Sequence, residues 1–455
     1  MKKIKTNGGA AMLISVVFFL FISLSIISGL VSPTVREFKN ASVNLNSKKS
    51  YFLAESGSED ALYRLINGIA ISENPDSEII TLDSNSVTTT ITTNGSSKQI
   101  TSLGDVKSYQ RKTSISLTTG VGTSFNYGVQ VGQGGLEMSN TSKIVGNVYS
   151  GGEIEGENSA SITGTAVVSG TSGKIETIQV DGDATAHFIE GSTIGGSTNS
   201  YDLKTTRVTG NVVATTITSC TGTVGGNATF DTKASCTIAG TQTTPNPVDF
   251  VDPEVTPLPI TDEQVLAWEN DAAIWGTINS QTYDSGTTNL GPKKINGDLT
   301  VKNTATLNVT GTLWVTGKVT FENSAIVRLD SGYGSASGVI VAGVSGSTTA
   351  GLITLKNSAQ IQGSGTAGSY IMLLSQMVNT ASTSIDAGNT GSAAILYAGY
   401  GLIDINNSGA FKEITAAKLK ISNSATITYE SGLANVNFSS GPSGGYSIES
   451  WKETE

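Results

Sequence analysis

The first apolar stretch of the chain is long enough to cross a membrane as a helix. Residues 10–31 hold 22 positions without a charge, and Lys2, Lys3 and Lys5 precede them. As a helix this run is roughly 33 Å long, which matches a hydrocarbon core of about 30 Å. The lysines favour a cytoplasmic N-terminus, so we expect a single-pass membrane protein with the bulk of the chain outside the cell. An uncleaved signal anchor is the plain alternative, because a cleaved secretory signal has a shorter apolar region.

Two later parts of the chain repeat one short pattern of polar and aliphatic positions. Asn, Ser or Thr, a small residue, any residue and an aliphatic one recur from Asn140, Asn158, Asn303, Asn323, Asn357 and Asn423, and a related copy starts at Asn407. Read as one, two or three turns, the spacings of 18, 20, 34, 50 and 16 predict a unit of about 17 residues. Such a period without intervening helices is typical of a parallel β-solenoid.

Each position of the repeat has a physical role in a solenoid coil. Alternate aliphatic side chains point into the column, while Asn tolerates the left-handed backbone of a corner. Stacked Asn side chains can also hydrogen-bond along the axis. The sequence therefore predicts a mainly β fold with parallel β-helix blocks at 126–244 and 290–440.

A proline-rich connector separates the blocks. Residues 245–289 contain five of the nine prolines, and Thr261 with Gln264 forms a capping box before Val265, Leu266 and Trp268. We expect an extended segment and a short helix, packed through Leu266 and Trp268, that either caps the first block or lies along its side. Residues 441–455 are expected to cap the second block.

Residues 32–125 show a helix followed by strands. An alternating run ends at Asn94 and Gly95, a strong hairpin signal, and a later run places Ile115 and Leu117 on one face of a strand. This predicts a long helix packed on a small antiparallel sheet.

The N-terminal residues resemble a prepilin leader. Gly8 and Gly9 lie between the lysines and the apolar run. In that family a peptidase cuts after such a glycine and leaves the helix as a filament-packing stem. The resemblance implies a leader at 1–9, a transmembrane helix at 10–31 and processing at Gly8, Gly9 or Ala10. It also implies other pilins and a prepilin peptidase as partners.

The stretch "KKSYFLAESGSEDALYRL" resembles PilX-type minor pilins, proteins of type IV pilus biogenesis. On a helix it predicts a stripe that lies against the sheet, formed by Phe52, Ala54, Ser58, Ala61, Leu62 and Leu65. The resemblance implies a pilin-like head at 32–125. One departure is that the fifth mature residue, Glu in most major pilins, is Ile14 or Leu13 here. This fits a tip or initiating subunit, or a protein that never polymerises. The solenoid blocks resemble bactofilin-like and adhesin-like β-helices through their periodicity alone.

The composition of the chain limits the classes of molecule that it can bind. The chain has 53 glycines, only 14% charged residues and a net charge of −10, and no basic block follows residue 5. Nucleic acid is therefore excluded as a partner, because its binding needs a clustered basic surface. No cofactor is indicated.

The chemistry-bearing residues are few. Cys220 and Cys236 are 16 residues apart, close to one coil, so an exported protein is expected to join them in a disulfide; two buried thiols are the alternative. The sequence contains no Cys-x-x-Cys motif, so neither a zinc site nor a redox site is indicated. The single histidine, His187, has no partner that the sequence assigns. Two neighbouring coils offer an acidic patch, more often a solvated face, at Glu153, Glu155, Asp181 and Asp183.

These patterns favour a non-enzymatic, minor-pilin-like surface protein, on the cell membrane or in a pilus, whose solenoid serves adhesion or assembly contacts, with surface glycans as candidate partners. Two alternatives stay open. A membrane-anchored polysaccharide hydrolase or lyase would need carboxylates clustered in a groove. A structural envelope fibre would need open column ends.

Overall fold

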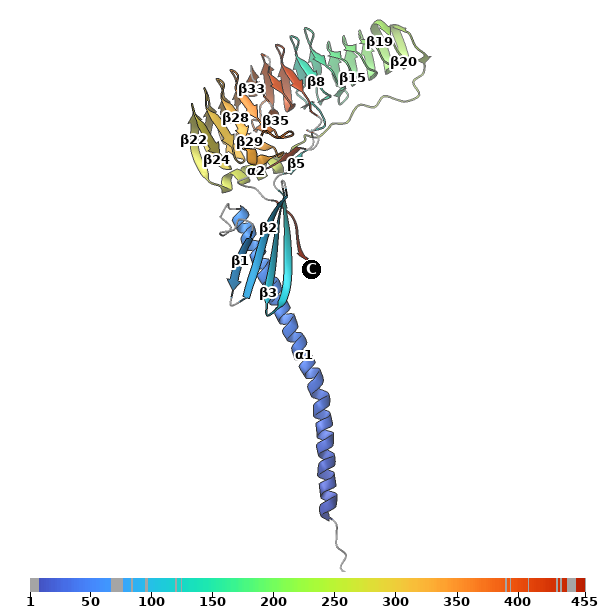
Figure 1. Cartoon of the computed structure of the whole chain (residues 1–455). Helices are drawn as coiled ribbons and strands as arrows, with labels where there is room; N and C mark the ends of the chain where they lie inside the picture. The colour runs from blue at the N-terminus through green and yellow to red at the C-terminus, as the bar shows by residue number, and fades with distance from the viewer. Residues whose placement is uncertain are drawn as a thin grey trace, which may run out of the picture. The chain divides into compact units, whose positions relative to one another are not determined.

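The computed structural model describes residues 8–66, 77–82, 85–94, 97–118, 121–123, 125–388, 391–392, 394–407, 409–430, 433, 436–439 and 447–454. Two compact units divide the chain. The head comprises α1, the first four strands and the C-terminal strand, and the solenoid unit comprises the described residues from Thr118 to Ser447 (Figure 1). Leader residues 1–7 and most of the predicted Asn94–Gly95 turn lie outside the described residues.

The head is one long helix with an antiparallel sheet. Helix α1 spans Gly8–Ile66. The sheet order is β1-β2-β3-β4-β40, formed by Ser77–Leu82, Asn85–Asn94, Ser97–Val106, Tyr109–Thr118 and Ser447–Thr454. β2 and β3 pair from Ser86 with Asp105 to Asn94 with Ser97, the hairpin that the alternating run predicts.

The second half of α1 packs closely on this sheet because its inner face carries small residues. Ala54, Ser58 and Ala61 are fully buried, and a Cβ added to Gly104 of β3 would lie 2.2 Å from the carbonyl oxygen of Ser50. The predicted stripe is wrong at one position. Phe52 is 61% exposed, and Leu53 is buried in its place.

The C-terminal segment differs from the prediction. β40 pairs in the head sheet and does not cap the solenoid. Its backbone groups find partners beside β4, although the two strands are more than 300 residues apart in the sequence. The whole solenoid is therefore inserted between two neighbouring strands of the head.

The solenoid coils carry strands on three faces. For example, β10, β11 and β12 of one coil pair in parallel with β7, β8 and β9 of the coil before it. One face in the first block is formed by β8 (Lys143–Val145), β11 (Ser161–Ile162), β14 (Gln179–Val180), β16 (Thr193–Ile194) and β18 (Arg207–Val208). The same face in the second block is formed by β23 (Thr287–Leu290), β25 (Thr306–Val309), β28 (Ile326–Leu329), β31 (Gln360–Gln362), β34 (Gly391–Ser392), β36 (Ala410–Phe411) and β38 (Thr426–Thr428).

The other two faces carry the remaining parallel strands. In the first block these are β6 (Val129–Val131), β7 (Leu136–Met138), β9 (Val148–Ser150), β10 (Ile154–Gly156), β12 (Ala166–Val168), β13 (Lys174–Glu176), β15 (Ala184–Glu190), β17 (Thr198–Lys204), β19 (Val212–Val224), β20 (Ala228–Ile238) and β21 (Gln242–Thr243). In the second block they are β22 (Thr277–Tyr283), β24 (Lys293–Val301), β26 (Leu313–Val315), β27 (Val319–Phe321), β29 (Gly338–Ala342), β30 (Ile353–Leu355), β32 (Ile371–Ser375), β33 (Thr383–Gly388), β35 (Ala394–Asn406) and β37 (Glu413–Ile421). Stacked aliphatic side chains such as Ile144, Ile162 and Val180 fill the column.

The repeated asparagines form the corners, as predicted. All seven have positive φ, between 49° and 59°. Several side-chain amides bond from coil to coil, as between Asn158 and Asn140 at 3.1 Å and between Asn357 and Asn323 at 3.0 Å.

The predicted unit of about 17 residues agrees with the 18 residues that separate the successive paired positions Lys143, Ser161 and Gln179. The second block departs from a uniform period. Asn323 and Asn357, 34 residues apart, belong to adjacent coils, because Val327 pairs directly with Ile361. The additional residues include the 3₁₀ helix η1 (Ser331–Tyr333) and the turns around Gly346. The next coil is long as well, since Ile353 pairs with Ile385. In the first block, paired residues of adjacent coils are 14 to 21 apart, as in Lys174 with Phe188 and Ile154 with Ile175.

The two blocks form one continuous column. β37 pairs with β6 and β7, and β38 pairs with β8, so the last coils of the second block stack on the first coils of the first block. We call this junction the seam. The chain enters and leaves the column here, and β5 (Val121–Thr123) pairs antiparallel with β39 (Val436–Phe438) as a neck.

The connector lies along the side of the column, which decides between the two predicted placements. It runs back from the end at β20 to α2, Asp262–Ile274 (Figure 1). Gln130 and Tyr149 hydrogen-bond its backbone. α2 starts with the predicted capping box and buries Val265 and Trp268, whereas Leu266 is exposed, contrary to the prediction. Strands β29 and β32 under α2 are buried on both faces and so lack polar alternation.

Candidate functional site

The first half of α1 is an uncovered apolar stem. Its most apolar window has a mean hydropathy of 2.7, and none of that window is buried. By length and composition this helix can cross a membrane. Leu13 and Ile14, the two candidates for the fifth mature residue, are 69% and 68% exposed. The processing candidates Gly8, Gly9 and Ala10 form the first helical turn of the described chain.

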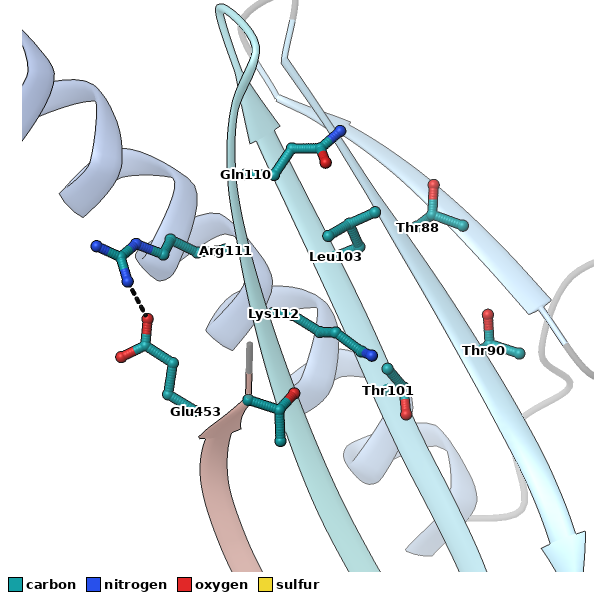
Figure 2. Close-up of a pocket in the computed structure, with 9 residues that line it drawn as sticks. Thr88, Thr90, Thr101, Leu103, Gln110, Arg111, Lys112 and Glu453 are labelled. Carbon is teal, nitrogen blue, oxygen red and sulfur yellow. Dashed lines mark hydrogen bonds and ion pairs between the residues drawn. The ribbon is translucent and has the colours of Figure 1, made fainter.

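A hollow of about 750 Å³ lies at the head sheet (Figure 2). Its lining comes from β2, β3, β4 and β40, and comprises Thr88, Thr90, Thr101, Leu103, Gln110, Arg111, Lys112, Glu453 and Thr454. Arg111 bridges β4 to the C-terminal strand, with its Nη1 3.0 Å from Oε1 of Glu453. This ion pair helps to hold β40 in the sheet, although its exposure limits its contribution to at most about 1 kcal/mol.

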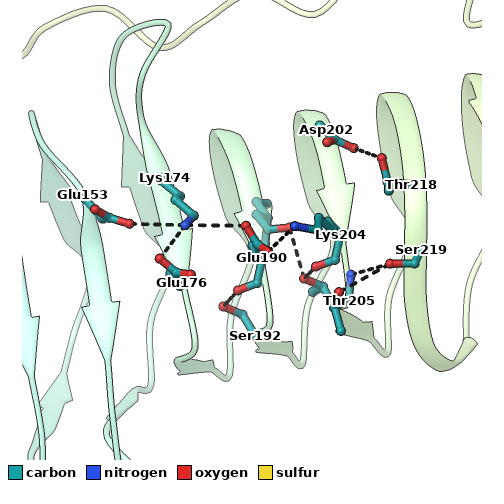
Figure 3. A network of polar contacts seen from close by, with 12 residues as sticks. Glu153, Lys174, Glu176, Glu190, Ser192, Asp202, Lys204, Thr205, Thr218 and Ser219 are labelled. Carbon is teal, nitrogen blue, oxygen red and sulfur yellow. Dashed lines mark hydrogen bonds and ion pairs between the residues drawn. The ribbon is translucent and has the colours of Figure 1, made fainter.

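The predicted acidic patch does not form as one cluster. Glu153 belongs to a charge ladder that runs across coils of the first block, with Lys174 Nζ 3.7 Å from its Oε1 and Lys204 paired to Glu190 further along (Figure 3). Asp183 instead accepts a hydrogen bond from the backbone N–H of Ser197 and Asp181 accepts one from Gln179. Glu153 and Asp183 therefore contact neighbouring coils, whereas Asp181 is bonded within its own coil.

Glu155 lies in a separate groove of about 320 Å³ at the seam, with Glu137, Glu157, Asp404 and Lys420. Burial raises the pKa of Asp404, and the neighbouring Asp386 raises it further. Burial also acts to raise the pKa of Glu137, but hydrogen bonds from Lys418 and Lys420 outweigh it and leave this pKa below its usual value. The seam groove was missed in the sequence because its residues come from both blocks.

Cys220 and Cys236 are joined in a disulfide, with their Cα atoms 4.9 Å apart. The bond links β19 to β20 near one end of the column.

His187 has a carboxylate partner that the sequence did not assign. Its Nδ1 lies 2.8 Å from Oδ1 of Asp252 in the connector, and its ring stacks on Tyr201 with 4.6 Å between centroids. Phe250 of the connector packs edge-on against the same ring. These contacts fasten the connector to the first block, and that structural task accounts for the histidine.

A smaller pocket of about 280 Å³ lies between α2 and the column wall. We call it the α2 pocket; its lining comprises Ile260, Asp262, Val265, Ser345, Gly346, Leu374, Ser375, Gln376, Val378, Tyr397, Gly399 and Tyr400. The hydroxyl of Tyr397 donates to the backbone carbonyl of Ile260 at 3.0 Å. That of Tyr400 lies 3.0 and 3.1 Å from the two carboxylate oxygens of Asp262. The sequence did not predict this pocket, because its lining residues come from four segments that are far apart in the chain.

Comparisons with known proteins leave the family open. No family model matches the chain, and no curated protein matches it. A structure search finds the competence-associated pilin ComZ from Thermus thermophilus, at 9% identity over 90% of this chain and 97% of that one, with a TM-score of 0.26. At that identity and score the likeness carries no argument about this chain.

Proposed function

We propose that the chain is a non-enzymatic surface protein of a type IV pilus system, similar to PilX-type minor pilins, which displays its solenoid outside the cell for adhesion or assembly contacts. The observation that carries this proposal is the division of α1. Its first half is apolar and uncovered, and its second half packs through Ala54, Ser58 and Ala61 on an antiparallel sheet. This is the arrangement that the resemblance of residues 48–65 implies.

The connectivity supports display. The solenoid is inserted between β4 and β40, and its neck strands β5 and β39 pair with each other. Both ends of the insertion therefore meet at the neck, and the head sheet includes strands from before and after it.

The test is the mature N-terminus of protein purified from its native membrane, measured by mass spectrometry in strains with and without prepilin peptidase. We expect a start at Gly9 or Ala10 that depends on the peptidase. Gly8→Ala and Gly9→Ala would show which glycine the peptidase requires for cleavage, and Gly29→Ala in the same helix is the matched control. An intact leader in both strains would sink the pilin assignment.

A polysaccharide hydrolase is a second candidate because of the seam groove. The pKa values of Asp404 and Glu137 are shifted in opposite directions there, as in pairs that divide acid and base roles. Release of reducing ends from a polysaccharide by the full chain, lost in Asp404→Asn, would favour it over the first proposal.

A further inference from the structure

The α2 pocket combines an apolar floor with an aromatic rim. Leu374 and Tyr397 are buried beneath it, whereas Tyr400 is 48% exposed and Val378 is 40% exposed at its edge. Small-molecule pockets usually enclose about 300–1,000 Å³. At about 280 Å³ this one suits a single ring-sized group and not a long chain.

Tyr400 is held in place although it is exposed. Its hydroxyl bridges both carboxylate oxygens of Asp262. An exposed side chain normally loses rotamer entropy when a ligand binds, at a cost of about 0.5–1.5 kcal/mol. Because Asp262 already fixes the ring, a ligand that stacks on Tyr400 avoids most of that cost.

The polar groups at the pocket favour a ligand that donates hydrogen bonds. Asp262 has lone pairs beyond the one hydroxyl proton that it accepts. The Nε2 of Gln376 donates to Glu269 at 2.6 Å, and among the described residues nothing donates to its Oε1. No basic side chain is among the residues that line the pocket, so an acidic ligand finds no counter-charge.

The shape distinguishes a flat ring from a cation. A quaternary ammonium group is recognised by several aromatic faces around it. Here Tyr397 is only 5% exposed, which leaves Tyr400 as one open aromatic platform. A platform edged by hydrogen-bond acceptors matches a sugar ring, which has an apolar face and peripheral hydroxyl donors.

We propose that the α2 pocket binds one neutral sugar ring of a surface glycan, stacked on Tyr400 and hydrogen-bonded through its hydroxyls to Asp262 and Gln376. This inference rests on the proposed outward display of the solenoid and names the ligand class of the adhesive contact.

The test measures binding of the full chain in detergent to immobilised tetramers of glucose, mannose and N-acetylglucosamine. A galacturonic acid tetramer serves as the acidic comparison, and tetramethylammonium serves as the cationic competitor. We expect at least one neutral tetramer to bind. Tyr400→Ala should weaken it by at least tenfold, and Tyr400→Phe by about two- to fivefold because the ring remains but is no longer fixed.

Two further variants guard against loss of folding. Tyr63→Ala removes an exposed tyrosine, at 61%, from the head helix and should bind like the wild type. Ser345→Trp at the exposed rim should block the pocket while leaving the unfolding midpoint unchanged. Any of four results would overturn the proposal: no neutral tetramer binds, Tyr400→Ala and Ser345→Trp bind normally, the acidic tetramer binds equally well, or tetramethylammonium displaces the sugar. If sugar binding fails but the leader is still cleaved by prepilin peptidase, the sugar-binding proposal is wrong and the pilin proposal is unaffected.

Discussion

Asn140 donates a hydrogen bond from its side-chain amide to Oδ1 of Asn423, 283 residues further along the chain, at 3.1 Å. Asn423 donates in turn to Asn407 at 3.3 Å, and Asn158 donates to Asn140. One ladder of asparagines therefore crosses the seam without interruption. The blocks are joined by the same contacts that join coils within each block.

Replacing Asn140 should loosen the seam. Asn140→Ala loses two amide hydrogen bonds and puts Ala at a φ of +52°, so we expect a loss of about 2–3 kcal/mol in local stability. Asn140→Gly keeps the backbone conformation accessible and should cost about half as much. Hydrogen exchange in β6, β7 and β8 measures this, and equal protection in the two variants would contradict the explanation.

Glu413 should make stability depend on pH. It is fully buried, and burial raises the pKa of its carboxyl well above the usual value, although a hydrogen bond from Thr415 opposes the shift. Above the unfolded-state pKa of about 4.3, the unfolded chain releases a proton that the folded chain keeps, so stability falls as pH rises toward the folded-state pKa.

Glu413→Gln should remove this dependence. The difference in unfolding free energy between Glu413→Gln and the wild type should grow by up to about 1.4 kcal/mol per pH unit above pH 5. Denaturant titrations from pH 4 to 7 measure it, with Glu254→Gln at an exposed position of the connector as control. A constant difference across this range would show that Glu413 ionises equally in both states.

Gly104→Ala should separate α1 from the head sheet. The added methyl group would meet the backbone of Ser50 and Ala54, which cannot rotate away as a side chain can, so we expect a loss of about 1–3 kcal/mol. Gly29→Ala, with nothing within 4 Å, is the matched control. Hydrogen exchange of β3 reports the effect; unchanged protection would show that the helix can move outward freely.

Removing the disulfide should affect one end of the column. A closed loop of this length contributes about 3 kcal/mol in the chain-entropy description. Replacing Cys220 and Cys236 with Ser should therefore speed proteolysis within β19 and β20 and leave the seam unchanged. Thr216→Ser with Thr232→Ser, on the same two strands, is the control. Faster cleavage at the seam would mean that the column unfolds as a whole.

The solenoid was predictable because its signals are local. A left-handed corner favours Asn, so Asn158 and Asn323 mark corners without knowledge of their neighbours. Thr177 and Thr205 have left-handed backbones too, and the Asn pattern does not identify those corners. The length of the regular coils was predictable from spacing, but that of the long coils was not, because an insertion such as η1 changes the spacing without adding a coil. Spacing also could not predict the seam, where the backbone N–H of Lys143 donates to the backbone carbonyl of Ala425 in the other block.

The head and the pockets show the same division. The alternation in β2 and the small residues of α1 predicted a helix packed on a sheet. The sequence did not show that Leu53, and not the adjacent Phe52, faces that sheet. The sequence predicted a cap at β40 because nothing in a short C-terminal strand specifies which strand it pairs with. The partners in His187–Asp252 and Tyr400–Asp262 depend on where the connector lies, which its prolines do not specify.

Because the chain enters and leaves the column at the seam, both column ends are distant in sequence from the neck. A duplicated coil at either end would lengthen the column by one strand spacing, about 4.8 Å. The extended connector advances about 3.3 Å per residue, so it would need only one or two more residues to span the longer column. Gene duplication could therefore change the length of the solenoid in small steps while its attachment stays the same.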